Sequence, residues 1–117
     1  MGYIDGVIVA VKSDKKQEYI EFAKGTAQAF KKHGALSAVE CWGDDVPEGK
    51  VTSFPLAVKC EKDETVVFSW IIWPDKATRE AAWPAIEQDK DLEGLFSDMP
   101  FDGARLIYGG FEVIVNE

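Results

Sequence analysis

Histidine and cysteine are scarce in this sequence, with one histidine, His33, and two cysteines, Cys41 and Cys60, among 117 residues. Zinc sites, haem ligation, catalytic triads and Cys-His pairs all need histidine or clustered cysteine. The two cysteines are far apart and form no CxxC motif, so we expect two buried or half-buried free thiols. A P-loop and a GxGxxG motif are also missing. We therefore expect no metal, haem, flavin or other cofactor.

Positive charge is also in short supply, with 13 Lys and Arg against 21 Asp and Glu and a net charge of −8. A chain this acidic repels phosphate backbones and anionic lipids at long range. No apolar run approaches the ~20 residues of a membrane span, and the N-terminus lacks the basic region of a signal peptide. The sequence predicts no nucleic-acid or membrane partner and a cytoplasmic location.

The remaining composition is that of one globular domain. Hydrophobic residues make up 46% and charged residues 29% of the chain, which is ordinary for a folded protein. A length of 117 residues fits one domain. Because no linker, repeat or low-complexity tract interrupts the chain, we expect a single domain over residues 1–117.

The hydrophobic pattern changes between strand and helix periods along the chain. A helical period of apolar residues follows Asp14, which with Gln17 predicts a capping box, and Gly34 predicts the helix end. Asp75 predicts the start of a second helix, which Pro84 should kink or split. Strands are predicted over 3–12, 35–44, 66–73 and 106–115, a turn over 45–50, and a short helix or ordered loop over 51–59. This β-α-β-β-α-β order predicts an α+β, ferredoxin-like fold with a four-stranded antiparallel sheet.

The predicted strands are apolar on both faces, although two helices cover only one face of such a sheet. The uncovered face of an antiparallel sheet normally alternates in polar residues. In residues 66–73 one side carries Val67, Ile71 and Trp73, and the other carries Val66, Phe68, Trp70 and Ile72. A naked apolar face exceeds what monomers usually expose, so we expect a homodimer packed sheet to sheet. The alternative is a lid formed by residues 51–59.

Three separated segments, VECWGDDVPEGKVTSF, VVFSWIIWP and MPFDGARLIYGGFE, resemble the bacterial YbaA-like family, a domain of unknown function. The match covers essentially the whole chain, with one departure at Pro84, in a helix that usually lacks proline in the family. The resemblance implies membership of the dimeric α/β-barrel superfamily, in which two sheets pack face to face. That superfamily includes cofactor-free monooxygenases, haem-degrading enzymes, lactone isomerases and ligand-sensing domains, so it implies no single activity.

Strand alternation places Glu40, Trp42 and Asp44 on one face of the second predicted strand. Burial in an apolar sheet raises the pKa of a carboxyl group toward the range of a general base, so Glu40 and Asp44 are the candidate catalytic residues. The alternative is structural, with Glu40 paired to Arg105, Lys59 or a backbone donor, and Asp44 and Asp45 shaping the turn.

The candidate ligand-binding residues are aromatic side chains and one arginine. Aromatic residues in strands line pockets, but they also fill cores and dimer interfaces. Arginine binds anions, or forms structural ion pairs, here with Glu40 or Asp5. The candidates are Trp42, Trp70, Arg105 and Tyr108.

The sequence leaves three functions open and does not decide whether the chain is an enzyme. We favour a homodimer that binds a small organic molecule in a pocket between the sheet and the helices. The first alternative is a cofactor-independent enzyme of the monooxygenase or isomerase type, with Glu40 or Asp44 as general base. The second is a structural or interaction protein without catalysis.

Overall fold

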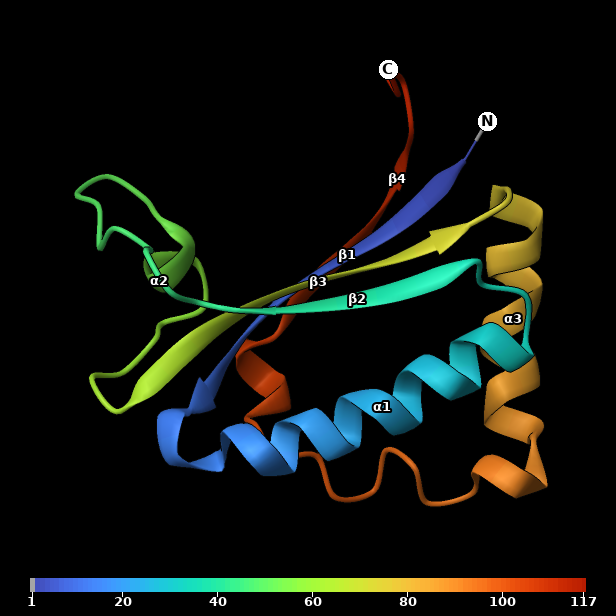
Figure 1. Cartoon of the computed structure of the whole chain (residues 1–117), viewed down its shortest axis with the longest axis horizontal. Coiled ribbons are helices and arrows are strands. Elements are labelled where there is room, and N and C mark those ends of the chain that lie inside the picture. Colours follow the sequence, from blue (N-terminus) through green and yellow to red (C-terminus); the bar gives the residue numbers. More distant parts are fainter. Residues whose placement is uncertain (1) are drawn as a thin grey trace.

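A computed structural model describes residues 2–117 and contains one four-stranded antiparallel sheet with helices packed on one side (Figure 1). In chain order the elements are β1 (Tyr3–Lys12), η1 (Ser13–Lys15), α1 (Lys16–Lys32), β2 (Ser37–Trp42), α2 (Phe54–Ala57), β3 (Glu64–Trp73), α3 (Lys76–Gln88), η2 (Lys90–Leu92), η3 (Gly103–Arg105) and β4 (Ile107–Glu112). The strand order in the sheet is β2-β3-β1-β4. The predicted α+β, ferredoxin-like fold is confirmed. Within residues 2–117, no helix is both long and apolar enough to cross a membrane.

The start of α1 differs from the prediction, because Asp14 lies in the short turn η1 and does not cap the helix. The backbone N–H of Ser13 donates to the carbonyl of Asp63 at 2.9 Å, and the Ser13 hydroxyl lies 2.7 Å from that of Thr65. These contacts hold the chain against β3 just after β1 ends. A 3-10 turn therefore comes first, and α1 begins at Lys16 without a side-chain cap.

The other helix boundaries follow the predicted signals. Gly34 ends α1 with a φ of +112°, a conformation that favours glycine. Asp75 caps α3, and its Oδ1 accepts a first-turn backbone N–H at 2.7 Å. The predicted split at Pro84 does not occur, since α3 continues through it as one helix of 13 residues. Ala82 and Ile86 are buried on either side of Pro84, so both halves of the helix pack into the core.

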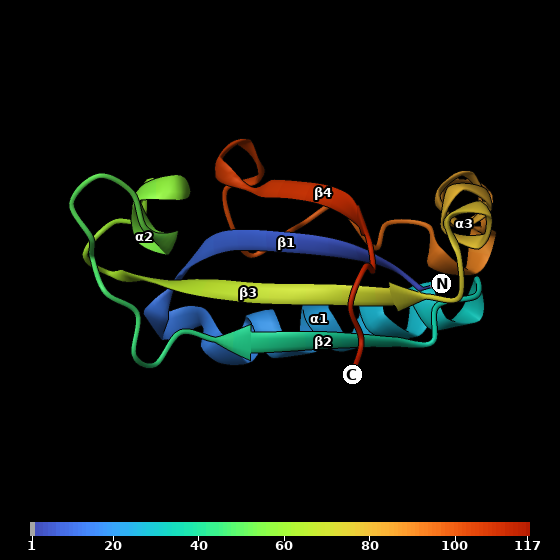
Figure 2. The ribbon, with the colours of Figure 1, turned by 90° about the horizontal axis from the view of Figure 1, so that it is seen from above.

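The two faces of the sheet meet different surroundings. The face toward α1 and α3 holds most of the core, which includes Val9, Val11, Tyr19, Phe30, Val67, Ile71 and Trp73. The opposite face, called the open face below, carries Ile4, Ile8, Val39, Phe68, Trp70, Ile72, Ile107 and Phe111. Over this face lie only α2 at one end and the C-terminal segment, residues 113–117, at the other (Figure 2). The predicted division of strand 66–73 into two apolar sides is confirmed.

The segment before β3 forms a lid over one end of the open face. Val58 is fully buried against Ala10 and Val66, and the ring of Phe54 lies 5.7 Å from that of Phe68. The lid does not reach the rest of the face, where the exposed fractions remain high: Ile107 41% and Phe111 60%. The lid, which was the alternative to a dimer, therefore covers one end of the open face and leaves the rest of it uncovered in a single chain.

The two cysteines are free, and they differ in exposure. Cys60 is half-buried under the lid, as expected for a free thiol. Cys41 is exposed, so its predicted burial is wrong. It lies on β2 opposite Phe68, on the open face, where no helix covers it.

Candidate functional site

Glu40 lies where α1 crosses β2, and its partner is a tyrosine. Strand pairing places Glu40 opposite Ser69, on the face toward α1. From the first turns of α1, Tyr19 donates its hydroxyl proton to Oε1 of Glu40 over 2.6 Å. Tyr19 is buried, whereas the Glu40 residue keeps contact with solvent. The structural alternative named the wrong partners for Glu40, because its carboxylate bonds to Tyr19 and not to Arg105, Lys59 or a backbone donor.

The surroundings of Glu40 favour its protonated form. Desolvation raises the pKa of Glu40 above the ordinary glutamate value, and this outweighs the opposing hydrogen bonds from Tyr19 and Ser69. Burial, with the nearby charge of Glu40, raises the pKa of Tyr19, so the phenol keeps its proton and donates it. A carboxyl group with a raised pKa and a side open to water is suited to accept or donate a proton.

Aromatic rings surround this pair and give Trp42 a packing role. The Tyr19 ring centroid lies 6.5 Å from that of Trp42 and 6.2 Å from that of Phe101. Phe22 lies 5.7 Å from Phe101, which closes the cluster on the α1 side. Above the Trp42 ring, Nζ of Lys16 lies 5.5 Å from the centroid. Trp42 therefore packs between a cation and the core.

The structure separates the other candidate residues from Glu40 and Trp42. Asp44 lies beyond the end of β2 at Trp42, so strand alternation does not carry it onto the same face. Trp70 lies on the open face, across the sheet from Trp42. Tyr108 is 76% exposed on the edge strand β4, opposite Val7. The candidates therefore do not form a single site.

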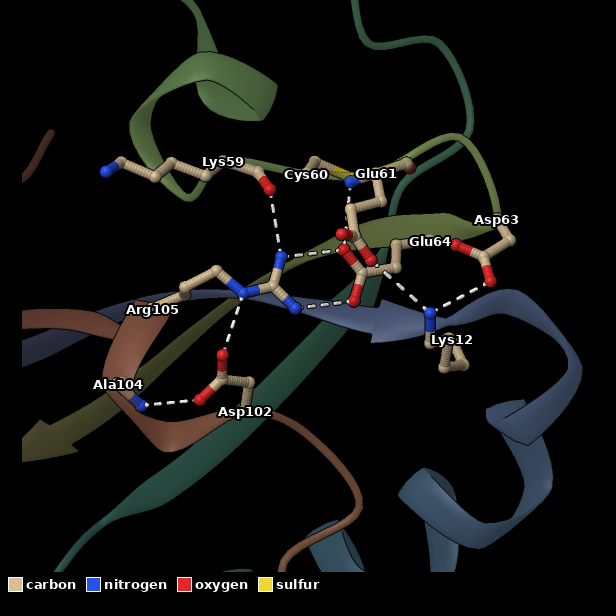
Figure 3. A network of polar contacts seen from close by, with 9 residues as sticks. All are labelled: Lys12, Lys59, Cys60, Glu61, Asp63, Glu64, Asp102, Ala104 and Arg105. Carbon is tan, nitrogen blue, oxygen red and sulfur yellow. Dashed lines mark hydrogen bonds and ion pairs between the residues drawn. The ribbon is translucent and has the colours of Figure 1, made fainter.

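Arg105 is held in a network of ion pairs (Figure 3). Its Nη1 and Nη2 donate to the two carboxylate oxygens of Glu64, each at 2.7 Å, and its Nε donates to Asp102 at 3.0 Å. The side chain of Glu64 is 3% exposed, and the guanidinium group lowers its pKa to about 2. Because all three nitrogens of Arg105 are engaged, it has a structural role. Arg105 pairs with Glu64 and Asp102, so the predicted pairing with Glu40 or Asp5 is wrong.

The same network fixes the segment that follows α2. Nη1 of Arg105 also donates to the carbonyl of Lys59 at 2.9 Å, and Lys59 has a positive φ of 51°. At the outer edge, Nζ of Lys12 donates to Asp63 at 2.9 Å. Figure 3 shows these side chains joining the ends of β1 and β3 to η3. The network holds the lid on the sheet.

A second ion pair, between Asp5 and Arg79, is buried under α3, and sequence reasoning did not find it. Asp5 is 3% exposed and accepts hydrogen bonds from Nη2 of Arg79 at 2.8 Å and from the Trp73 indole at 2.9 Å. The guanidinium also lies 5.5 Å from the centroid of the Tyr3 ring. Nothing in the sequence spacing links these residues, because they meet only when α3 folds back onto β1. The contact fixes α3 on the sheet.

His33 has a structural role at the end of α1. Its Nε2 lies 2.8 Å from Oδ2 of Asp89, which also accepts from Nζ of Lys32 at 2.7 Å. Lys32 and His33 together lower the pKa of Asp89 to about 2, so this carboxylate stays ionised and joins α1 to the chain after α3. Among residues 2–117, no cluster of three or more His, Cys, Asp or Glu side chains is arranged to hold a metal ion.

Two open cavities lie at opposite ends of the open face, in the part of the chain that the structure describes. The smaller has a volume of about 300 Å³, and its lining includes Asp44, Pro55, Cys60 and Glu64. The larger, about 490 Å³, lies beneath the C-terminal segment, and its lining includes Ile4, Leu36, Ile72, Val113, Val115 and Asn116. Neither lies between the sheet and helices α1 and α3, where we expected the pocket.

We expect Glu40→Gln to leave the fold equally stable or more stable at neutral pH. A raised pKa in the folded state means that the wild type loses stability as pH rises through the range where Glu40 ionises. Glutamine does not ionise, yet its carbonyl still accepts from Tyr19. Any gain in the free energy of unfolding should therefore be larger at about pH 8 than at about pH 4. It should stay below about 1 kcal/mol because water screens Glu40.

Thermal melts of wild type and Glu40→Gln at the two pH values measure this difference. Glu21→Gln, on the exposed side of α1 and paired only with Lys24 at 3.8 Å, is the matched control and should change little. A clear loss of stability in Glu40→Gln at neutral pH would show that the ionised carboxylate is a structural acceptor. Glu40 would then no longer be a candidate base.

Comparison with known proteins gives relatives without an established activity. The uncharacterized protein YbaA of Escherichia coli (strain K12) is 53% identical over 117 residues, which is 100% of both chains, and that of Shigella flexneri matches equally. Among solved structures, the de novo designed protein Foldit4 aligns over 97% of this chain and 100% of its own, at 12% identity and a TM-score of 0.47. The model of the family described as protein of unknown function (DUF1428) matches residues 2–103. This chain belongs to the DUF1428 family.

Proposed function

We propose that this protein is a homodimer of the dimeric α/β-barrel type and that it binds a small organic molecule. The observation that carries the proposal is the open face. Between α2 and the C-terminal segment, its positions on the four strands bear no charged side chain, and its large apolar residues remain exposed in a single chain. The occupant that we propose for this face is a second copy of the chain.

The size of the open face supports a dimer. Strands about 4.8 Å apart and about 20–34 Å long give a four-stranded sheet about 500 Å² in projection. This area is in the upper part of the ~300–600 Å² range of the largest apolar patch on a typical monomer, and such patches are often functional. In a dimer, α2 and the C-terminal segment at the two ends would add to it, toward the ~800 Å² that each partner contributes to a stable interface. Two copies with a net charge of −8 each repel one another, but the open face keeps those charges out of the contact.

The larger cavity supports the second part of the proposal. Its volume of about 490 Å³ lies within the range of ~300–1,000 Å³ that is common for small-molecule sites. It opens at the end of the face that the second copy would cover, so the dimer would enclose it further. We accordingly move the proposed pocket from the helix side of the sheet to the open face.

Acid–base catalysis at Glu40 is a second candidate function, favoured by the raised pKa of this residue beside a tyrosine hydroxyl. It needs no cofactor, which fits an isomerase or a cofactor-independent monooxygenase. The substrate would have to approach from the solvent side of Glu40. Asp44, the other candidate base, lines the smaller cavity.

Native mass spectrometry of the protein purified from its host tests the proposed function. We expect a species of about 26 kDa, twice the 13.0 kDa chain, carrying an added small mass that denaturation releases. Dilution through the micromolar range should leave the dimer intact. A species of 13.0 kDa alone, with no added mass at any concentration, would contradict both parts of the proposal.

A further inference from the structure

The larger cavity is built as a site for a particular chemical class. Its floor is the end of the open face at Ile4 and Ile72, and Leu36 forms one side. The C-terminal segment crosses above the ends of β1 and β3 and supplies Val113 and Val115 as the opposite side (Figure 2). The lining of the cavity therefore combines residues near both ends of the chain with residues of the two central strands, β1 and β3.

The lining of this cavity carries no charged side chain among the residues that the structure describes. Asn116 is the polar residue of the lining, while the indole N–H of Trp73 is already bonded to Asp5 on the other side of the sheet. A net charge of −8, with Glu117 on the C-terminal segment, further disfavours an anion. A carboxylate placed to bind a cation is also missing from the lining.

The wall of the cavity is incomplete in a single chain. Leu36 is 61% exposed and Val115 is 70% exposed, although both face an apolar hollow. The C-terminal segment has left the sheet after Glu112, and within residues 2–117 the N–H of Val113 bonds it to the carbonyl of Gly2 at 3.1 Å. A bound molecule would cover these side chains and order the segment above it.

We propose that this cavity binds an uncharged, mainly apolar small molecule with one hydrogen-bonding group directed at Asn116. The inference rests on the proposed function, because a second copy on the open face closes the side that one chain leaves exposed. Beyond the proposed function, it names the chemical class of the ligand, the residues that line its site and the C-terminal segment as the part of the chain that covers it. Specificity comes from shape and from the cost of bringing a charge into an apolar lining.

A matched pair of fluorescent probes tests the chemical class. N-phenyl-1-naphthylamine is neutral and apolar, and 8-anilino-1-naphthalenesulfonate has the same ring skeleton with an added anionic sulfonate. We expect the neutral probe to bind with about one site per chain, and the anion to bind at least about tenfold more weakly. Equal or tighter binding of the anion would overturn the assigned class, as would failure of the neutral probe to bind.

The position of the site is tested on ¹⁵N-labelled wild type. Addition of the neutral probe should shift the amide signals of Leu36, Val113, Val115 and Asn116. Shifts confined to the middle of the open face, at Val39 and Phe68, would overturn the assigned position. This experiment needs no substitution, and the shifts can be measured whether the protein is a monomer or a dimer.

Two substitutions of one type complete the test. Leu36→Glu places a charge in the wall and should weaken the neutral probe at least about tenfold. The matched control is Val51→Glu, at a position 98% exposed and outside the lining, which should bind like wild type. Unchanged binding in Leu36→Glu would overturn the site. Sedimentation velocity on the same samples separates the two proposals, because a monomeric wild type that binds the neutral probe at these residues supports the site and contradicts the dimer.

Discussion

Trp70→Asp is expected to convert a dimer of about 26 kDa into a monomer of 13.0 kDa. Trp70 lies near the middle of the open face, opposite Gly6 on β1 and Val39 on β2. In a dimer packed through this face, a two-fold axis brings each substitution into the interface twice. An unpaired carboxylate buried there costs several kcal/mol, which exceeds what an interface of this size can absorb. Light scattering and sedimentation velocity at micromolar concentration measure the mass.

Two controls separate loss of assembly from loss of folding. Val51→Asp changes an apolar side chain that is 98% exposed and outside the open face, and it should remain a dimer. Ile71→Asp changes the next residue along β3, which is buried toward the helices, and it should unfold the chain. A folded Trp70→Asp variant that stays a dimer would show that the interface lies elsewhere.

Arg79→Ala is expected to lower the free energy of unfolding by about 3–5 kcal/mol, a large part of the ~5–15 kcal/mol of a typical domain. The substitution removes the cation from the Asp5 carboxylate, a residue that is 3% exposed in the wild type, and leaves it the Trp73 indole as side-chain donor. Urea unfolding, followed by circular dichroism, measures the loss. The matched control is Lys76→Ala on the same helix, where an exposed pair with Glu80 at 3.8 Å should contribute less than about 0.5 kcal/mol.

A double variant shows whether the loss comes from the stranded charge. Asp5→Asn combined with Arg79→Met removes both charges, keeps an acceptor for Trp73 and restores apolar contact over the Tyr3 ring. It should be more stable than Arg79→Ala by at least about 1 kcal/mol. If Arg79→Ala itself costs less than about 1 kcal/mol, water reaches Asp5 and the pair does not fix α3.

Hydrophobic period and helix-end residues were sufficient to predict the fold. Strand and helix differ in the spacing of apolar side chains, and this spacing is a local property that one sequence displays. Alternation also placed Trp70 and Ile71 on opposite sides of β3, but it did not show which side is covered by the helices; the structure buries Ile71 and leaves Trp70 half-buried on the open face. Asp75 and Gly34 marked real boundaries, because a side-chain cap and a positive φ are also local requirements.

The polar partners could not be predicted, since they depend on contacts between distant segments. Glu40 meets Tyr19 only because α1 crosses β2 at that point. Arg105 lies in η3, at the end of the sheet where β3 begins, so it reaches Glu64 there. Strand alternation also failed at Asp44, because alternation holds only while the strand continues. The candidate site was therefore predicted for Glu40 itself but not for its surroundings.

The ion pair between Asp5 and Arg79 should restrict which substitutions can be accepted at these two positions. Loss of either charge alone leaves the other stranded in the core, so a lineage that changes one residue first passes through a poorly folded protein. Replacement of both at once by apolar residues of similar volume costs much less. Positions 5 and 79 should therefore be inherited as a unit, either both retained or both exchanged, while the exposed pair at positions 76 and 80 drifts freely.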